Sequence, residues 1–212
     1  MEKEISVVKR RSRGREPLNI EKIHEMVEYA VEGITGVSSS QVEMSSGLQF
    51  FDGITTDEIQ QILVKSAADL ISLDKPNYQF VAGRLLLFSL RKQVFKRMWD
   101  HPQFYTHVKK CVDMKLYDNE ILENYNEEDF NQMQSWLDHS RDYDFTYAGL
   151  RQVIDKYLVQ DRSTGEVFET PQFMYMMISA TVFANYPKTS RMNYVRRYYD
   201  AISNFKINIP TP

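Results

Sequence analysis

Positively charged side chains gather at the start of the chain. Residues 1–22 carry seven Lys and Arg against four Asp and Glu, whereas the whole chain has a net charge of −3. Lys9, Arg10 and Lys22 stand close in sequence to Asn19, a residue type that caps helix N-termini. The free N–H groups of a helix start and the positive end of its dipole attract anions. We therefore expect these groups to gather around a phosphate; the alternative interpretation is a solvated basic hairpin on a helical bundle.

The pattern around these residues predicts a strand, a turn, a second strand and a helix. Ile5 to Lys9 is short and rich in β-branched residues, and Gly14 can supply the positive φ that a hairpin bulge needs. Apolar residues then recur at helical spacing from Asn19 to about Glu32, and Gly33 follows where a C-cap would end the helix. The hairpin should therefore deliver the chain to the start of the first helix.

Three more helices are predicted before residue 100. They are expected from Ser40 to just before Asp52, from Thr55 until Pro76 breaks the pattern, and from Tyr78 to about Arg97. The first two open with apparent capping boxes, Ser40-x-x-Glu43 and Thr55-x-x-Glu58, in which side chain and backbone satisfy each other. The apolar stripes by themselves indicate a packed helical bundle.

The second half of the chain is expected to be mostly helical, with one hairpin and a final strand. The expected elements are helices over Phe104–Met114, Asn126–His139, Thr146–Tyr157, Pro171–Tyr186 and Thr189–Ser203, a hairpin over 158–168, and a strand over Lys206–Ile209. The many Met and aromatic residues here are assigned to the core.

Composition excludes several classes of protein. No apolar run approaches the ~20 residues of a membrane span, so we expect a cytoplasmic protein without membrane contact. The single cysteine, Cys111, cannot form a disulfide framework, and the four histidines lack metal-ligand spacing, so no metal site is predicted. The basic segment is too short for a nucleic-acid reader in an otherwise acidic chain, so no nucleic-acid partner is expected.

Several motifs occur in the order and spacing of a known family. The chain contains Val7-x-Lys9-Arg10, Glu16-x-x-Asn19-x-x-Lys22-Ile23, Asp52-Gly53-Ile54-Thr55-Thr56-Asp57-Glu58-Ile59, Lys65-x-Ala67-Ala68, Tyr78-Gln79-x-Val81-Ala82-x-Arg84-Leu85 and Pro210-Thr211-Pro212. The first motifs resemble the ATP-cone domain that regulates ribonucleotide reductases. The whole chain is similar to the N-terminal part of the large subunit of class I ribonucleoside-diphosphate reductase.

The resemblance implies a mainly α fold in two domains. Residues 1–96 would form the ATP-cone, a four-helix bundle with a small β-hairpin cap. Residues 97–212 would form the helical N-terminal part of the ten-stranded reductase barrel domain, which would be incomplete here.

The resemblance also implies binding residues. ATP or dATP would be held as an allosteric effector by residues of the hairpin, the first helix and two later helices: Lys9, Glu16, Pro17, Leu18, Asn19, Ile20, Glu21, Lys22, Thr56 and Lys92. Thr211 would contact the diphosphate of a ribonucleoside diphosphate substrate. Gln60 stands where some relatives have a histidine that helps to sense dATP, so we expect weak inhibition by dATP.

Ribonucleotide reduction in this family needs a thiyl-radical cysteine and a reducing cysteine pair, and this chain has one cysteine. No catalytic residue is therefore expected in it. The resemblance implies that a cysteine-bearing barrel completes the large subunit, and that a separate small subunit carries a diiron-tyrosyl radical. Because the predicted final strand, Lys206–Ile209, has no neighbouring partner strand in the sequence, we expect the barrel to be a second chain. The alternative is a stand-alone nucleotide-sensing module; the long helical region and Thr211 favour the reductase.

Overall fold

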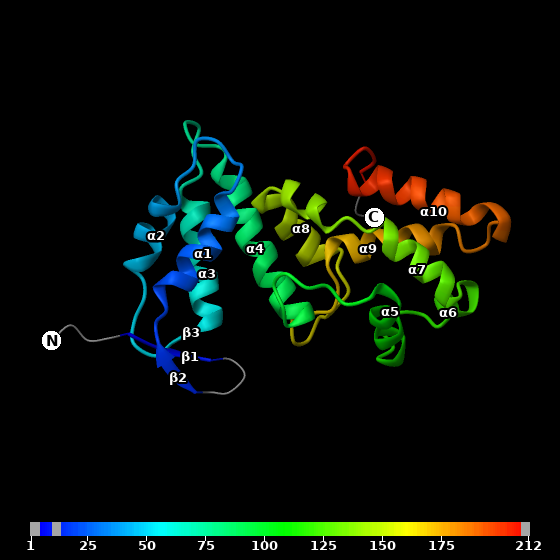
Figure 1. Ribbon diagram of the computed structural model, residues 1–212, viewed down its shortest axis with the longest axis horizontal. Coiled ribbons are helices and arrows are strands. Elements are labelled where there is room, and N and C mark those ends of the chain that lie inside the picture. Colours follow the sequence, from blue (N-terminus) through cyan, green and yellow to red (C-terminus); the bar gives the residue numbers. More distant parts are fainter. Residues whose placement is uncertain (1–4, 10–13, 209–212) are drawn as a thin grey trace. The chain divides into compact units, whose positions relative to one another are not determined.

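The computed structural model describes residues 5–9 and 14–208 (Figure 1). The chain divides into two compact units. The first comprises Met1–Ser89 and Tyr143–Arg151, and the second comprises Leu90–Asp142 and Gln152–Pro212. The first unit therefore takes a short segment from the second half of the sequence.

A small sheet lies at one end of the first unit. Strand β1 (Ser6–Val8) pairs antiparallel with β2 (Arg15–Pro17) and parallel with β3 (Ile54–Thr55), so the strand order is β2-β1-β3. The hairpin of β1 and β2 confirms the prediction from sequence. The third strand was not predicted, because two residues become a strand only through a partner distant in the sequence. The turn of the hairpin lies outside the described residues.

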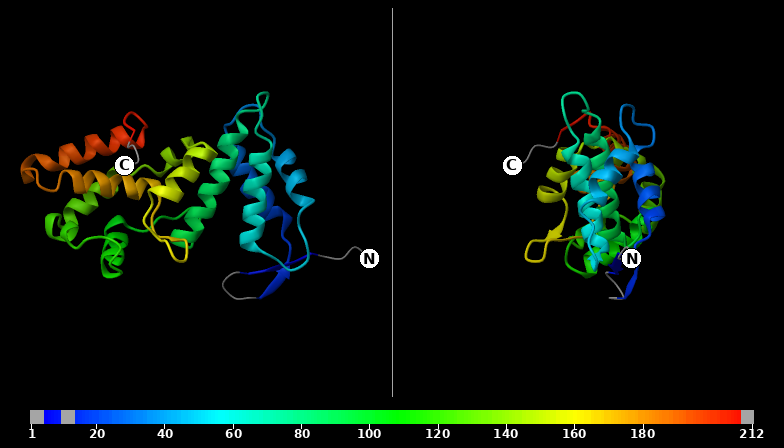
Figure 2. Two further views of the ribbon diagram at one scale, coloured as in Figure 1. Left: turned by 180° about the vertical axis from the view of Figure 1, so that it is seen from behind. Right: turned by 90° about the vertical axis from the view of Figure 1, so that its left-hand side faces the viewer.

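Four helices make up most of the rest of this unit, and the small sheet lies at one end of them (Figure 2). They are α1 (Ile20–Val31), α2 (Ser39–Gly47), α3 (Thr56–Asp69) and α4 (Tyr78–Phe95), which belongs to the first unit up to Ser89. Their core contains fully buried apolar side chains from all four helices and from β3, among them Val27, Ala30, Val42, Ile54, Leu63, Val81 and Leu85. The predicted mainly α fold with a four-helix bundle is confirmed.

The start of α2 differs from the prediction. Its N-cap is Ser38, which makes no side-chain cap bond, so the predicted Ser40-x-x-Glu43 capping box is wrong. Glu43 instead contacts His24 of α1, with 2.8 Å between His24 Nδ1 and Glu43 Oε1. Since a carboxylate favours the protonated imidazole, this contact raises the pKa of His24.

The second unit is built from helices with one short hairpin. Its elements are the end of α4, α5 (Phe104–Asp113), α6 (Glu120–Asn124), α7 (Glu127–Trp136), the 3-10 helix η1 (His139–Asp144, up to Asp142), the end of α8 (Tyr147–Lys156), β4 (Gln160–Asp161), β5 (Glu166–Val167), α9 (Pro171–Val182) and α10 (Lys188–Ser203). A helix is present in each predicted segment of this unit, although α7 and α9 end earlier than predicted, at Trp136 and Val182. The β4–β5 hairpin is confirmed, and α6 and η1 were not predicted.

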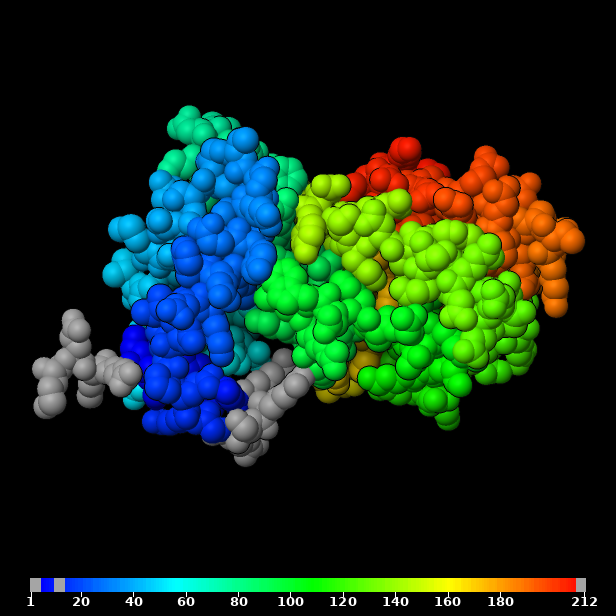
Figure 3. Space-filling view, viewed as in Figure 1, coloured from blue at the N-terminus to red at the C-terminus, as the bar shows by residue number. Residues whose placement is uncertain are grey.

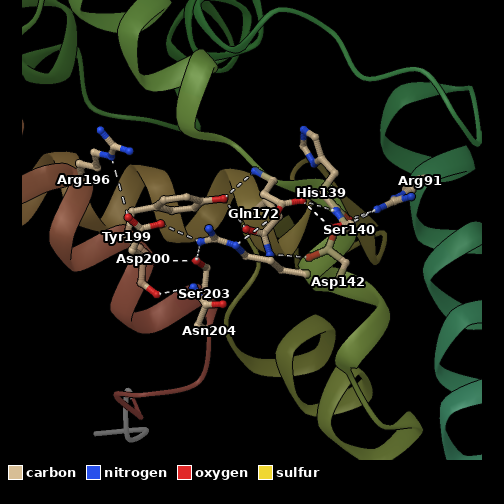
Figure 4. A network of polar contacts seen from close by, with 12 residues as sticks. Arg91, His139, Ser140, Asp142, Gln172, Arg196, Tyr199, Asp200, Ser203 and Asn204 are labelled. Carbon is tan, nitrogen blue, oxygen red and sulfur yellow. Dashed lines mark hydrogen bonds and ion pairs between the residues drawn. The ribbon is translucent and has the colours of Figure 1, made fainter.

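Buried polar groups tie four elements of this unit together (Figure 4). Asp142 of η1 contacts Arg91 of α4 at 3.3 Å and accepts a hydrogen bond from Gln172 of α9 at 2.8 Å. Tyr199 of α10 donates to Gln172 at 2.7 Å and accepts from the Asp138 N–H at 2.9 Å. Such a network fixes the relative positions of these helices, because each group would be costly to bury alone.

The predicted strand over Lys206–Ile209 is wrong in its described part, residues 206–208. Phe205 adopts a left-handed conformation with φ 55°. Its N–H donates to Ile202 O at 3.1 Å, and the Lys206 N–H donates to Ala201 O at 2.9 Å. These two bonds form a Schellman motif that ends α10. The alternating apolar residues predicted a strand here, but the Lys206 N–H is bonded to the helix end.

Candidate functional site

The hairpin connects directly to the start of α1. Ser6 pairs with Pro17, and the Leu18 N–H donates to Ile5 O at 2.9 Å. Asn19 follows with an extended backbone, and its Oδ1 accepts the Lys22 N–H at 3.0 Å. The predicted N-cap is confirmed, and the helix start is fixed beside the sheet.

The first turn of α1 is open to solvent. The blue segment containing β1, β2 and α1 lies at the surface in Figure 3, and the Ile20 side chain is 70% exposed. The helix cannot satisfy the N–H groups of Ile20 and Glu21 with its own carbonyls. Together with the exposed Lys22, these donors can bind an anionic oxygen.

Lys9 directly follows β1, the first strand of the hairpin, and makes two contacts there. Its Nζ lies 2.6 Å from Glu16 Oε2, and its N–H donates to Gly14 O at 2.9 Å. Because both charged side chains remain partly exposed, a phosphate can compete with Glu16 for Lys9. A displaced Glu16 carboxylate could in turn accept a hydrogen bond from a ribose hydroxyl.

The strand register separates the groups that were expected around one phosphate. The start of α1 follows the Ser6 end of β1, whereas Lys9 follows Val8 at the opposite end. At about 3.4 Å per residue, a three-residue strand places these groups about 10 Å apart along the backbone. That span exceeds a single phosphate and suits an extended nucleotide.

Thr56 leaves the sheet at the same end as Lys9. Val8 and Thr55 are partners in the parallel β1–β3 pair, so Lys9 and Thr56 are the next residues on neighbouring strands. Thr55 Oγ1 accepts the Glu58 N–H at 3.1 Å, and Glu58 Oε2 accepts the Thr55 N–H at 2.8 Å, which confirms this capping box. Thr56 is exposed at the first position of α3.

Asp52 is a residue of the site region that the sequence did not single out. Its Oδ1 accepts from both the N–H and the Oγ of Ser6, at 2.9 and 2.6 Å, and the Gly53 N–H donates to Ser6 O at 2.9 Å. These bonds join β1 to the turn before β3. The sequence signal that could have indicated this turn and strand is the Asp-Gly pair followed by the β-branched residues Ile54 and Thr55.

Four other residues that the sequence singled out are not assigned to this site by the described structure. Lys92 is exposed on the part of α4 that belongs to the second unit, so its role stays a prediction. Arg10 and Thr211 lie outside the described residues. Gln60 is 4% exposed and donates from Nε2 to Leu85 O at 3.0 Å, which places its amide between α3 and α4.

The described residues contain no group of three or more His, Cys, Asp and Glu that could hold a metal ion. Within that same part of the chain, each helix is too short or too polar to cross a membrane. Cys111 is 2% exposed, its Sγ lies 3.4 Å from His107 Nε2, and burial raises its pKa to about 11. At neutral pH it is therefore a buried, protonated thiol.

Comparisons with known proteins find two domains. Residues 5–93 match the model of the ATP cone domain, and residues 143–212 match that of the ribonucleotide reductase all-alpha domain. The chain is 48% identical over 206 residues to ribonucleoside-diphosphate reductase 1 subunit alpha of Escherichia coli (strain K12), covering 97% of this chain and 27% of that protein.

Two further relatives carry similar names. Ribonucleoside-diphosphate reductase 1 subunit alpha of Salmonella typhimurium is 49% identical over 100% of this chain and 28% of its own length. The ribonucleoside-diphosphate reductase subunit alpha of Enterobacteria phage T4 is 40% identical over 91% of this chain and 25% of its own length. The chain thus spans about a quarter of the length of the curated relatives it matches.

Proposed function

We propose that this chain binds ATP or dATP as an allosteric effector. It has the ATP-cone domain and the ribonucleotide reductase all-alpha domain in its sequence matches, and it is similar to the N-terminal region of ribonucleoside-diphosphate reductase alpha subunits. One observation carries this proposal. The open first turn of α1 and the Lys9–Glu16 pair lie at opposite ends of β1, at a spacing that suits a nucleoside triphosphate.

The proposed roles follow from the chemistry of each group. The first-turn N–H groups of α1 and Lys22 bind phosphate oxygens at one end of β1. Lys9 and Thr56 contact the nucleotide at the other end, where Glu16 can accept from the ribose. Residues 17–21 form the backbone between these ends, and Lys92 adds a phosphate contact from α4.

Calorimetric titration of the 212-residue chain with ATP and with dATP tests this proposal. Lys22→Ala and Lys9→Ala should each weaken nucleotide binding about tenfold or more, because each removes a charge-assisted contact. Lys65→Ala is the matched control, since it removes an exposed lysine from α3 of the same unit and should leave affinity unchanged. Equal affinity in the wild type and in both site variants would refute the assignment.

We further propose that the chain contributes to the reduction of ribonucleoside diphosphates only as part of a larger enzyme. Its one cysteine is buried and protonated, whereas the reaction needs several reactive cysteines. A cysteine-bearing barrel, expected as a second chain, and a radical-generating small subunit would supply this chemistry in the cytoplasm, with Thr211 at the substrate diphosphate. The predicted final strand lends no support to a division into two chains, because residues 206–208 are not a strand. Assaying reduction by the barrel chain and small subunit with and without this chain tests the proposal; full activity without it would contradict it.

A further inference from the structure

The last turn of α1 is held by a side chain of α4. Arg84 Nη1 donates to Glu32 O at 2.6 Å and to Ala30 O at 3.4 Å. The carbonyls at a helix C-terminus lack partners within the helix, and a guanidinium there also interacts favourably with the helix dipole. The position of the end of α1 is thus coupled to Arg84.

The same guanidinium lies against Tyr143. Arg84 Cζ is 5.4 Å from the centroid of the Tyr143 ring, within the range of a cation–π contact. Phe88, one turn further along α4, meets that ring edge to face at 6.3 Å. Tyr143 is therefore held by two residues on one face of α4.

The backbone next to Tyr143 touches α4 directly. A Cβ added to Gly83 would lie 2.5 Å from Phe145 O and 3.2 Å from Tyr147 N, so only glycine permits this approach. Phe145 is 6% exposed and Leu150 is fully buried. These contacts explain why Tyr143–Arg151 belongs to the first unit.

This segment is continuous with the second unit at both ends. The preceding residue, Asp142, belongs to the buried network with Arg91 and Gln172. At its other end, α8 leaves the first unit after Arg151 and continues to Lys156. Residues 143–151 are thus joined covalently to Asp142 on one side and to the rest of α8 on the other.

We propose that Gly83, Arg84 and Phe88 form a clasp that makes residues 143–151 respond to the nucleotide bound at the start of α1. The effector part of this inference rests on the proposed function. A bound phosphate restrains the N-terminus of α1, a helix transmits this restraint along its axis, and Arg84 links the far end to Tyr143. Arg84 is a positioning residue here, because it acts on the segment and touches no nucleotide.

Hydrogen exchange of the full chain with and without ATP tests the clasp. In the wild type, ATP should slow exchange at residues 16–22 and, by at least about threefold, at 143–151. Arg84→Gln should keep the slowing at 16–22 and an ATP affinity within about threefold, yet lose the slowing at 143–151. Lys65→Gln, which also removes a positive charge from this unit, should behave as the wild type.

A second measurement without nucleotide separates the clasp from the proposed function. Arg84→Gln and Tyr143→Leu should each speed exchange both at residues 28–32 and at 143–147, and the double variant should add little to the stronger single change. Additive, separate effects at the two segments would overturn the clasp. If ATP does not bind the wild type, the proposed nucleotide site and its effect on residues 143–151 are both refuted. The exchange rates of the variants without nucleotide then still show whether Arg84 and Tyr143 act together. ATP binding without any effect at 143–151 would refute the inference alone.

Discussion

Asp142 keeps a carboxyl group in the interior of the second unit. It is 1% exposed, and burial raises its pKa from 3.8 to about 6 despite the contact with Arg91. A carboxyl with a raised folded-state pKa binds its proton more tightly in the folded state. It therefore favours folding below pH 4 and loses this contribution as the pH rises to about 6, by up to about 3 kcal/mol.

Asp142→Asn should remove this pH dependence. The variant keeps the shape and a hydrogen bond to Gln172 but cannot ionise. The free energy of unfolding of the wild type relative to the variant should fall between pH 4 and 7, as measured by urea denaturation. Asp100→Asn, at the exposed pair with Arg97, is the control and should show no such slope in this range. A constant difference between wild type and Asp142→Asn would show that Asp142 is not the titrating group.

Gly83 and Gly47 give a matched test of close packing. Both lie in helices, and alanine is favoured over glycine in a helix by about 1 kcal/mol. At Gly83 the new Cβ meets Phe145 O, whereas at Gly47 nothing lies within 4 Å. We expect Gly83→Ala to destabilise the chain by about 1–3 kcal/mol, as overpacking does, and Gly47→Ala to be neutral or slightly stabilising. Thermal denaturation of both variants decides this, and equal shifts in Tm would contradict it.

Among the elements, helix starts differ in how they are capped. Thr55 exchanges two bonds with Glu58, whereas Thr170 precedes Pro171 as the N-cap of α9 without a side-chain cap bond, and its Oγ1 is buried without a partner. We expect Thr55→Ala to lower the free energy of unfolding by about 1 kcal/mol.

Thr170→Val should stabilise the chain by about 1 kcal/mol, because it removes a buried unsatisfied hydroxyl while keeping the shape. Denaturant unfolding of both variants tests the contrast; destabilisation by Thr170→Val would imply a partner for the hydroxyl.

The helices could be predicted from sequence because their caps and apolar stripes are local. Asn19, Thr55 and the Asn126–Asp129 capping box of α7 mark their helix starts as expected. The failures have non-local causes. Strand β3 forms only because it pairs with β1, which is distant in the sequence. Glu43 contacts His24 of another helix and does not form the predicted capping box.

The candidate site was predictable in its residue types but less so in its geometry. Sequence indicated Asn19 and the lysines, and Thr55 at the start of α3, but the register of β1 decides which of them lie at the same end of the sheet. Asp52 was overlooked because its role depends on Ser6, 46 residues earlier. No local pattern could show that Tyr143–Arg151 packs in the first unit.

At the scale of the whole molecule, we expect the response to the proposed effector to depend on residue 60 in the core of the first unit. Gln60 lies in the core, where its amide donates to Leu85 O, and it cannot acquire a positive charge. To contact a nucleotide it would have to break this bond and leave its place in the core. A histidine at this position could instead become positively charged.

The completed reductase should therefore be only weakly inhibited by dATP, even where dATP binds this chain. We expect less than a twofold loss of ribonucleoside-diphosphate reduction at dATP concentrations that saturate binding in calorimetry. Measuring both on the same preparation separates failure to bind from failure to inhibit. Gln60→His is a suitable companion variant, since a histidine can become positively charged and should strengthen inhibition by dATP if residue 60 takes part in sensing the nucleotide. Strong inhibition by low dATP would show that inhibition in this protein does not depend on an ionisable residue at position 60.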